Sequence, residues 1–112
     1  MDERARRIGL NEAVFRQVNE RIQELADSFG LAEEELDLIC ECGNATCTSR
    51  IGMDQREYEA LRSDSAAFAV VSGHEILDVE EIVERHPGYD VVRKRAGDAK
   101  KVAEQTDPRA GD

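Results

Sequence analysis

Three cysteines gather in one short stretch, Cys40-Glu41-Cys42-Gly43-Asn44-Ala45-Thr46-Cys47, and they are the only 3 cysteines in the 112-residue chain. Alternate residues of a strand point to the same face, so Cys40 and Cys42 share a face. The Gly43-Asn44 pair is typical of a turn and would return Cys47 towards them. The three thiols can therefore converge. Structural zinc sites use such thiolates, usually in a closed set of four Cys and His ligands.

The fourth ligand must come from elsewhere in the chain. His74 is the first candidate, because it follows Gly73 at the end of a predicted buried strand. His86 lies in a predicted turn and is the second candidate, and Asp54, beside the returning strand, is the third. A neutral imidazole adds no negative charge to three thiolates, whereas a carboxylate would add one to a chain of net charge −10. We therefore predict a zinc site formed by Cys40, Cys42, Cys47 and His74. The second ring nitrogen of His74 is expected to donate to a backbone carbonyl or to a carboxylate, for which Glu75 is a candidate.

Other states of the cysteines stay open at this point. They could be reduced free thiols, since a free cysteine is often a small buried apolar residue. A Cys42–Cys47 disulfide is a second alternative, although an odd cysteine count fits poorly with a disulfide framework. An iron–sulfur cluster is a third, but such clusters usually take four cysteines.

Apolar residues at helical spacing follow the N-terminus. They predict a helix over 11–29 whose core-facing side carries Val14, Val18, Ile22, Leu25 and Phe29. Asn11 is a suitable N-cap and Gly30 a natural stop. The charged residues 1–10 are expected to be a flexible N-terminus.

The rest of the chain favours strands and one short helix. Strands over 36–42 and 49–53 form a hairpin with the cysteines at its tip. Asp54 and Glu57 have the spacing of a capping box, which predicts a helix over 55–63. Residues 68–71 form a buried strand. Asp78 and Glu81 could cap a helix over 78–86, but the Pro87-Gly88 turn between two β-branched pairs favours a second hairpin.

These elements predict one α+β domain over residues 11–95. A long N-terminal helix packs on a small antiparallel sheet that carries a zinc knuckle, together with a second short helix. Residues 96–112 contain few apolar side chains, and we expect them to be a disordered tail.

Charge and hydropathy exclude several classes of function. A net charge of −10, from 25 acidic and 15 basic residues, argues against binding nucleic acid through phosphates and against an anionic membrane surface. No segment approaches the roughly 18 apolar residues of a membrane helix. Residues 1–10 lack the apolar run of a secretory signal, so the expected location is the cytoplasm, where thiols stay reduced.

Several short segments are the basis of a resemblance. They are Cys40-Glu41-Cys42-Gly43 with Cys47, Glu57-Tyr58-Glu59-Ala60-Leu61-Arg62, Phe68-Ala69-Val70, Gly73-His74-Glu75 and Val91-Val92-Arg93-Lys94. Over about residues 10–95 the chain resembles a group of short bacterial proteins of unknown function with a Cys-x-Cys-Gly-x3-Cys knuckle and a later Gly-His pair. The resemblance implies a shared zinc-type fold and no particular activity.

The sequence therefore predicts a small zinc-stabilised module that binds or regulates another protein. A small metal- or thiol-dependent enzyme is the alternative from a different class. The sequence favours the module, because it contains no phosphate-binding glycine loop and no nucleophile elbow. An acidic mimic of nucleic acid is a third alternative, based on charge alone.

Overall fold

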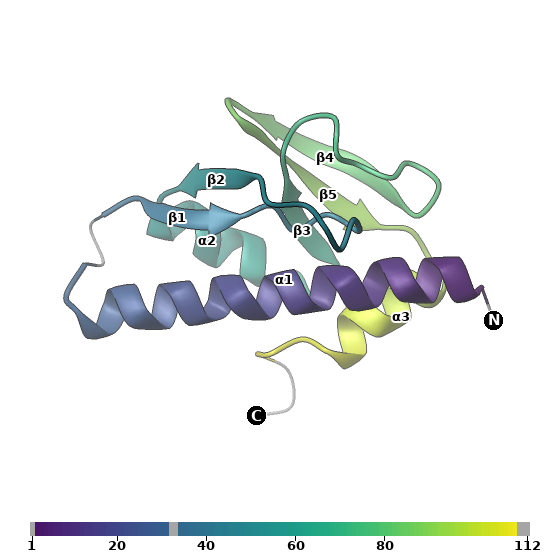
Figure 1. Ribbon diagram of the computed structural model, residues 1–112, viewed down its shortest axis with the longest axis horizontal. Helices are drawn as coiled ribbons and strands as arrows, with labels where there is room; N and C mark the ends of the chain where they lie inside the picture. The colour runs from purple at the N-terminus through teal and green to yellow at the C-terminus, as the bar shows by residue number, and fades with distance from the viewer. Residues whose placement is uncertain (1, 32–33, 110–112) are drawn as a thin grey trace.

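The computed structural model describes residues 2–31 and 34–109 and has the predicted α+β fold (Figure 1). A long helix runs along the long axis of the molecule, with the strands on one side of it and the last helix on another. In chain order the elements are α1 Glu3–Ser28, β1 Leu36–Ile39, β2 Arg50–Met53, α2 Gln55–Arg62, β3 Ala67–Val70, β4 Glu80–His86, β5 Tyr89–Lys94 and α3 Asp98–Gln105.

The strands form two antiparallel sheets, whereas the sequence predicts a single antiparallel sheet. β1 pairs with β2, with Leu36 opposite Met53, and the other sheet has the order β3-β5-β4. The knuckle hairpin and the strand before His74 are therefore in different sheets. They are joined where β1 ends, because the backbone N–H of Glu41 donates to the carbonyl of Ala69 in β3 at 2.8 Å.

The predicted capping box at Asp54 and the predicted hairpin turn at Pro87-Gly88 are confirmed. The Asp54 carboxylate accepts a hydrogen bond from the Glu57 backbone N–H at 2.7 Å, and the Glu57 side chain accepts one from the Asp54 N–H, which completes the capping box of α2. The β4–β5 hairpin forms around Pro87-Gly88. Gly88 has φ of 89°, the positive value that the third position of a type II turn requires.

The predicted inward face of α1 is wrong. Val14, Val18, Leu25 and Phe29 are exposed, with 61%, 41%, 43% and 75% of their surface open to solvent. Ile22 alone of the predicted stripe packs partly against the core. The buried face of α1 is instead largely polar: Ala5, Ile8, Gly9, Glu12, Arg16, Asn19, Glu20 and Gln23.

Specific partners explain this orientation. Glu12 forms an ion pair with Lys94 of β5 at 2.5 Å, and Lys94 also pairs with Glu80 of β4. Arg16 donates to the carbonyl oxygens of Ser65 and Ala103 at 2.8 Å each. Buried polar groups are tolerated when they are hydrogen-bonded, and these bonds fix the rotation of α1.

The flexible N-terminus predicted for residues 1–10 is also a wrong prediction. α1 begins at Glu3, and the Asp2 carboxylate caps it by accepting from the Ala5 N–H at 3.1 Å. Ala5 and Ile8 are buried, so the first turns of α1 are packed. Residue 1 lies outside the described residues.

The tail predicted to be disordered contains α3, which packs against α1. Ala99, Val102 and Ala103 are buried, and the Thr106 hydroxyl oxygen accepts a hydrogen bond from Arg16 at 3.1 Å. Small apolar residues are enough here because the two helices approach closely: a Cβ on Gly9 would lie 3.1 Å from Cβ of Val102. Residues 110–112 lie outside the described residues. In the described part of the chain, no helix is both long enough and apolar enough to cross a bilayer.

Candidate metal centre

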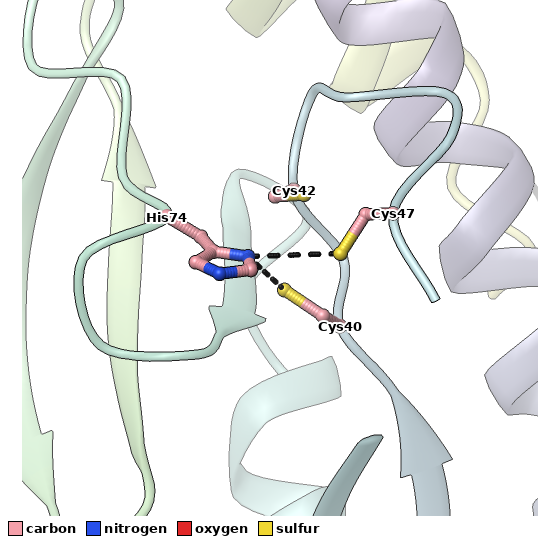
Figure 2. A group of neighbouring side chains, drawn as sticks. All are labelled: Cys40, Cys42, Cys47 and His74. Atoms are coloured by element: carbon pink, nitrogen blue, oxygen red, sulfur yellow. Dashed lines mark hydrogen bonds between the residues drawn. The ribbon is translucent and has the colours of Figure 1, made fainter. Parts of the chain in front are cut away.

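The structure brings together all four residues of the predicted site. The ligand atoms of Cys40, Cys42, Cys47 and His74 lie within 4.8 Å of one another. Figure 2 shows the three thiols converging from the knuckle onto the ring of His74, which comes from the loop after β3. Cys40 and Cys42 are buried and Cys47 is half-buried. All three cysteines are free, so the Cys42–Cys47 disulfide is not formed.

The spacing of these atoms suits a tetrahedral metal ion. The Nδ1 atom of His74 lies 3.6 Å from Sγ of Cys40 and 3.6 Å from Sγ of Cys47. Zinc–sulfur bonds of about 2.3 Å and zinc–nitrogen bonds of about 2.0 Å at a tetrahedral angle give an S···N separation of about 3.5 Å, close to the distances observed. The cluster is thus compatible with a metal site, with Nδ1 as the nitrogen ligand.

Hydrogen bonds already stabilise negative charge on the sulfurs. The backbone N–H of Val71 donates to Sγ of Cys40 at 3.2 Å. The hydrogen bond between the Cys40 and Cys42 side chains, helped by the Asn44 backbone N–H, lowers the pKa of the Cys42 thiol to about 5. The same contact, together with burial, raises the pKa of the Cys40 thiol. A thiolate is the form that binds metal.

The turn between Cys42 and Cys47 is built by Asn44. Its side-chain oxygen accepts from the Thr46 N–H at 3.0 Å, and its carbonyl accepts from the Cys47 N–H at 3.0 Å. An Asx turn of this kind imitates a backbone turn and brings Cys47 round to the other two thiols.

Gly43 is required because α1 lies against the knuckle. A Cβ at this position would be 2.6 Å from Cγ2 of Ile8 and 2.9 Å from Cδ1 of Ile76. The side chain of Asn11 donates to the Gly43 carbonyl at 2.9 Å. Helix α1 therefore supports the knuckle directly.

Glu41, between the first two cysteines, is a supporting residue that the sequence analysis missed. It points away from the thiols, into the core, and is fully buried. Arg62 of α2 donates to both of its carboxylate oxygens, at 2.7 and 2.9 Å, and Asn19 of α1 donates at 2.7 Å. The Ala69 N–H adds a fourth bond at 3.1 Å.

Strand alternation could have predicted that the Glu41 side chain points into the core. If Cys40 and Cys42 face the metal site, the residue between them faces the opposite way. A carboxylate buried there needs a cation, and an arginine on the neighbouring helix is the natural partner.

Asn19 attaches the end of β1 to α1. Its amide donates to the carbonyl of Ile39 and accepts from the N–H of Ile39, each at 2.9 Å. The Asn19 amide thereby makes the two hydrogen bonds with the Ile39 backbone that a neighbouring strand would otherwise make. The backbone that enters the knuckle is held on α1 by Asn19 and on α2 by Glu41.

The other candidate ligands lie elsewhere. His86 stacks on Tyr89, with ring centroids 4.6 Å apart, and its Nε2 lies 2.8 Å from a Glu84 carboxylate oxygen. Asp54 caps α2. The predicted contact between Glu75 and the second ring nitrogen of His74 is wrong, since the structure forms no such hydrogen bond within the described residues. Instead Oε2 of Glu75 is buried and has no partner in this part of the chain.

Comparison of the chain with protein families, with curated proteins and with solved structures gives no match. The resemblance to short bacterial proteins stays a prediction.

Proposed function

We propose that this protein is a small zinc-stabilised module that binds another protein. The observation that carries the proposal is the Cys3His set: one thiol or imidazole from each of Cys40, Cys42, Cys47 and His74 converges on one point. Three thiolates with one imidazole are a common ligand set for structural zinc, and softer ligands of this kind disfavour magnesium or calcium. No position is left for a substrate once four protein ligands are bound.

The site also lies where a metal would stabilise the fold. Cys40 and Cys42 leave the end of β1, and His74 follows β3 of the other sheet. A metal ion would link the two sheets across a chain separation of more than thirty residues. Binding energy at such a site becomes folding energy, because the unfolded chain does not hold the ligands together.

The binding role is supported by the outward face of α1. Val14, Val18, Leu25 and Phe29 are all exposed on one helix. The polar face of α1 is buried and hydrogen-bonded, so the helix cannot rotate to bury this apolar stripe. Apolar patches on a protein surface often mark contact sites for other proteins. Reduced thiolates are required by the proposal, as expected for a reducing compartment.

Metal content and melting in the same preparation test the proposal. Native mass spectrometry should give one zinc per chain, and a strong chelator should lower the melting temperature substantially. A chain free of metal with three titratable thiols would contradict zinc binding. A zinc-loaded chain whose melting curve is unchanged by removing zinc would contradict the stabilising role.

A further inference from the structure

The three thiols of the cluster differ in their access to solvent. Cys40 and Cys42 have 1% and 2% of their surface exposed, whereas Cys47 is half-buried. Residues 44–46 before Cys47 are exposed, and so is Thr48 after it. A small oxidant reacts with the thiolates that it can reach, so exposure decides which sulfur of a cluster is oxidised first. In this cluster that sulfur is Sγ of Cys47.

Cys40 is held firmly by neighbouring segments. Its backbone N–H donates to the carbonyl of Ser49 at 2.9 Å, and its Sγ accepts from the Val71 N–H at 3.2 Å. The next residue, Glu41, bonds through its backbone N–H and through its carboxylate to Ala69 of β3. The sulfur of Cys40 is therefore fixed to β3 and is the thiol least free to move.

Cys47 is held by bonds within its own turn. Its backbone N–H donates to the carbonyl of Asn44 at 3.0 Å, and the side-chain oxygen of Asn44 accepts from the Thr46 N–H at 3.0 Å. Both bonds lie inside the segment 42–47, so Cys47 can move relative to Cys42 by a small change in one turn. The Sγ atoms of the cluster lie within 4.8 Å of one another. A disulfide needs about 2.0 Å between two sulfurs, which is a shift of less than about 3 Å.

We propose that Cys47 makes the zinc site a redox switch, in which a peroxide oxidises Cys47, Cys42 closes a disulfide with it, and zinc is released. The inference rests on the proposed zinc-stabilised module and names how that site is regulated. The structure holds the reduced state, in which all three thiols are free.

The chemistry has two steps. The Cys47 thiolate attacks the peroxide, an S–O bond forms as the O–O bond breaks, and the leaving hydroxide takes a proton from solvent to become water. The Cys42 thiolate then attacks Sγ of Cys47, the S–O bond breaks, and the oxygen leaves with a second solvent proton as water. The two sulfurs lose two electrons, and hydrogen peroxide is reduced to two waters.

Loss of zinc follows from the change in ligands. A disulfide removes Cys42 and Cys47 from the site and leaves Cys40 and His74, whereas structural zinc takes four ligands. The link between β1 and the loop after β3 is then lost, so the oxidised protein should melt at a lower temperature. A disulfide is reversible, so a thiol reductant together with zinc should restore the starting state.

A graded series of hydrogen peroxide, added to the zinc-loaded full-length protein, tests the switch. A chromogenic chelator too weak to remove zinc from the untreated protein reports the released metal, and a thiol reagent counts the remaining thiols. One zinc should be released for every two thiols lost. Dithiothreitol followed by zinc should restore both the thiols and the melting temperature. Zinc that stays bound after two thiols are lost would overturn the switch.

A peptide map identifies the bonded pair. Cleavage of the denatured, alkylated protein after Glu41 separates Cys40 from the peptide that holds Cys42 and Cys47. In the oxidised protein that peptide should have lost the mass of two hydrogen atoms, and Cys40 should be alkylated. A bond that includes Cys40, or one between two copies of the chain, would overturn the proposed pairing.

Cys47→Ser tests which sulfur reacts first. Its Cys40 and Cys42 should remain titratable thiols at the peroxide dose that removes two thiols from the wild type, because both are buried. This readout does not require the variant to bind zinc, and the map of the wild type decides the pairing independently. Thr48→Ala, at the exposed neighbouring position, is the matched control and should respond as the wild type does. Equal loss of thiols in Cys47→Ser and in the wild type would overturn the role of Cys47.

Zinc content before peroxide is added separates this inference from the proposed function. A chain that carries one zinc and keeps it throughout the series overturns the switch alone and leaves the zinc-stabilised module standing. A reduced chain that takes up no zinc overturns the proposed function, and the switch with it.

Discussion

Arg62 donates a hydrogen bond to each carboxylate oxygen of Glu41, at 2.7 and 2.9 Å, with 2% and 0% of the two side chains exposed. The pair lies directly behind the thiol cluster, since Glu41 separates Cys40 from Cys42. The arrangement of the thiol cluster therefore depends on a charge pair in the core.

Removal of the Glu41 carboxylate tests that dependence. Glu41→Ala leaves the Arg62 guanidinium buried without its partner, and loss of one member of a buried pair costs about 3–5 kcal/mol. Urea unfolding of the zinc-loaded protein measures the change. Glu24→Ala is the control, because Glu24 pairs with Arg21 on the surface and 61% of its side chain is exposed. Its effect should stay within about 0.5 kcal/mol. Equal effects of the two substitutions would contradict the role of Glu41.

The choice of fourth ligand is tested by the two histidines. His74→Ala should lower zinc affinity at least about 10-fold, since loss of outer-shell support alone has an effect of that size. His86→Ala should leave the affinity nearly unchanged, because His86 stacks on Tyr89 instead of facing the thiols. Competition with a chromogenic chelator gives both affinities. Loss of zinc with His86→Ala and retention with His74→Ala would contradict the assignment.

The buried cluster of Glu12, Glu80 and Lys94 predicts a dependence of stability on pH. Burial raises the pKa of Glu12 well above its usual value of 4.5, against the attraction of Lys94, and the neighbouring Glu80 raises it further. The folded state therefore holds a proton more tightly than the unfolded state. The resulting stabilisation is complete below about pH 4.5 and is lost as pH rises through the raised pKa.

Glu12→Gln keeps this side chain neutral at every pH. The stability of the variant relative to wild type should therefore increase as pH rises above about 4.5. Urea unfolding at several pH values measures the difference. Glu81→Gln, a substitution of an exposed acid beside Glu80 on β4, is the control and should give a flat difference. A flat difference for Glu12→Gln would show that its folded pKa is not raised.

Deletion of residues 97–112 tests the packing of α3. The deletion removes the burial of Val102 and Ala103 and leaves Arg16 without two hydrogen-bond acceptors. Together these losses should lower the free energy of unfolding by at least about 2 kcal/mol. Lys101→Ala, at an exposed position of α3, should have little effect. An unchanged melting temperature in the deletion variant would support the tail expected from the sequence.

The features that sequence predicted correctly depend on short-range geometry. The shared face of Cys40 and Cys42 follows from strand alternation, and the cap at Asp54 from a spacing of three residues. The turn at Gly88 follows from its conformational freedom. The approach of His74 to the thiols is a contact between distant parts of the chain. It could be predicted because a closed zinc site needs a fourth ligand besides the three cysteines.

The features that sequence missed depend on pairing between distant segments. The apolar stripe of α1 has helical periodicity, but periodicity does not state whether the stripe faces the core of its own chain or another surface. The buried side of α1 is decided by Glu12, whose partner Lys94 lies 82 residues away. Likewise α3 offers only small apolar residues, and its close packing depends on Gly9.

X-ray absorption at the zinc edge measures the ligands of the metal in the purified protein, and so tests whether the Cys3His cluster binds zinc. We predict one zinc per chain with three sulfur ligands at about 2.3 Å and one nitrogen at about 2.0 Å. The His74→Ala variant should keep the sulfur signal and lose the imidazole. A spectrum with mostly oxygen ligands, or a chain that binds no zinc while its three thiols are reduced, would contradict it.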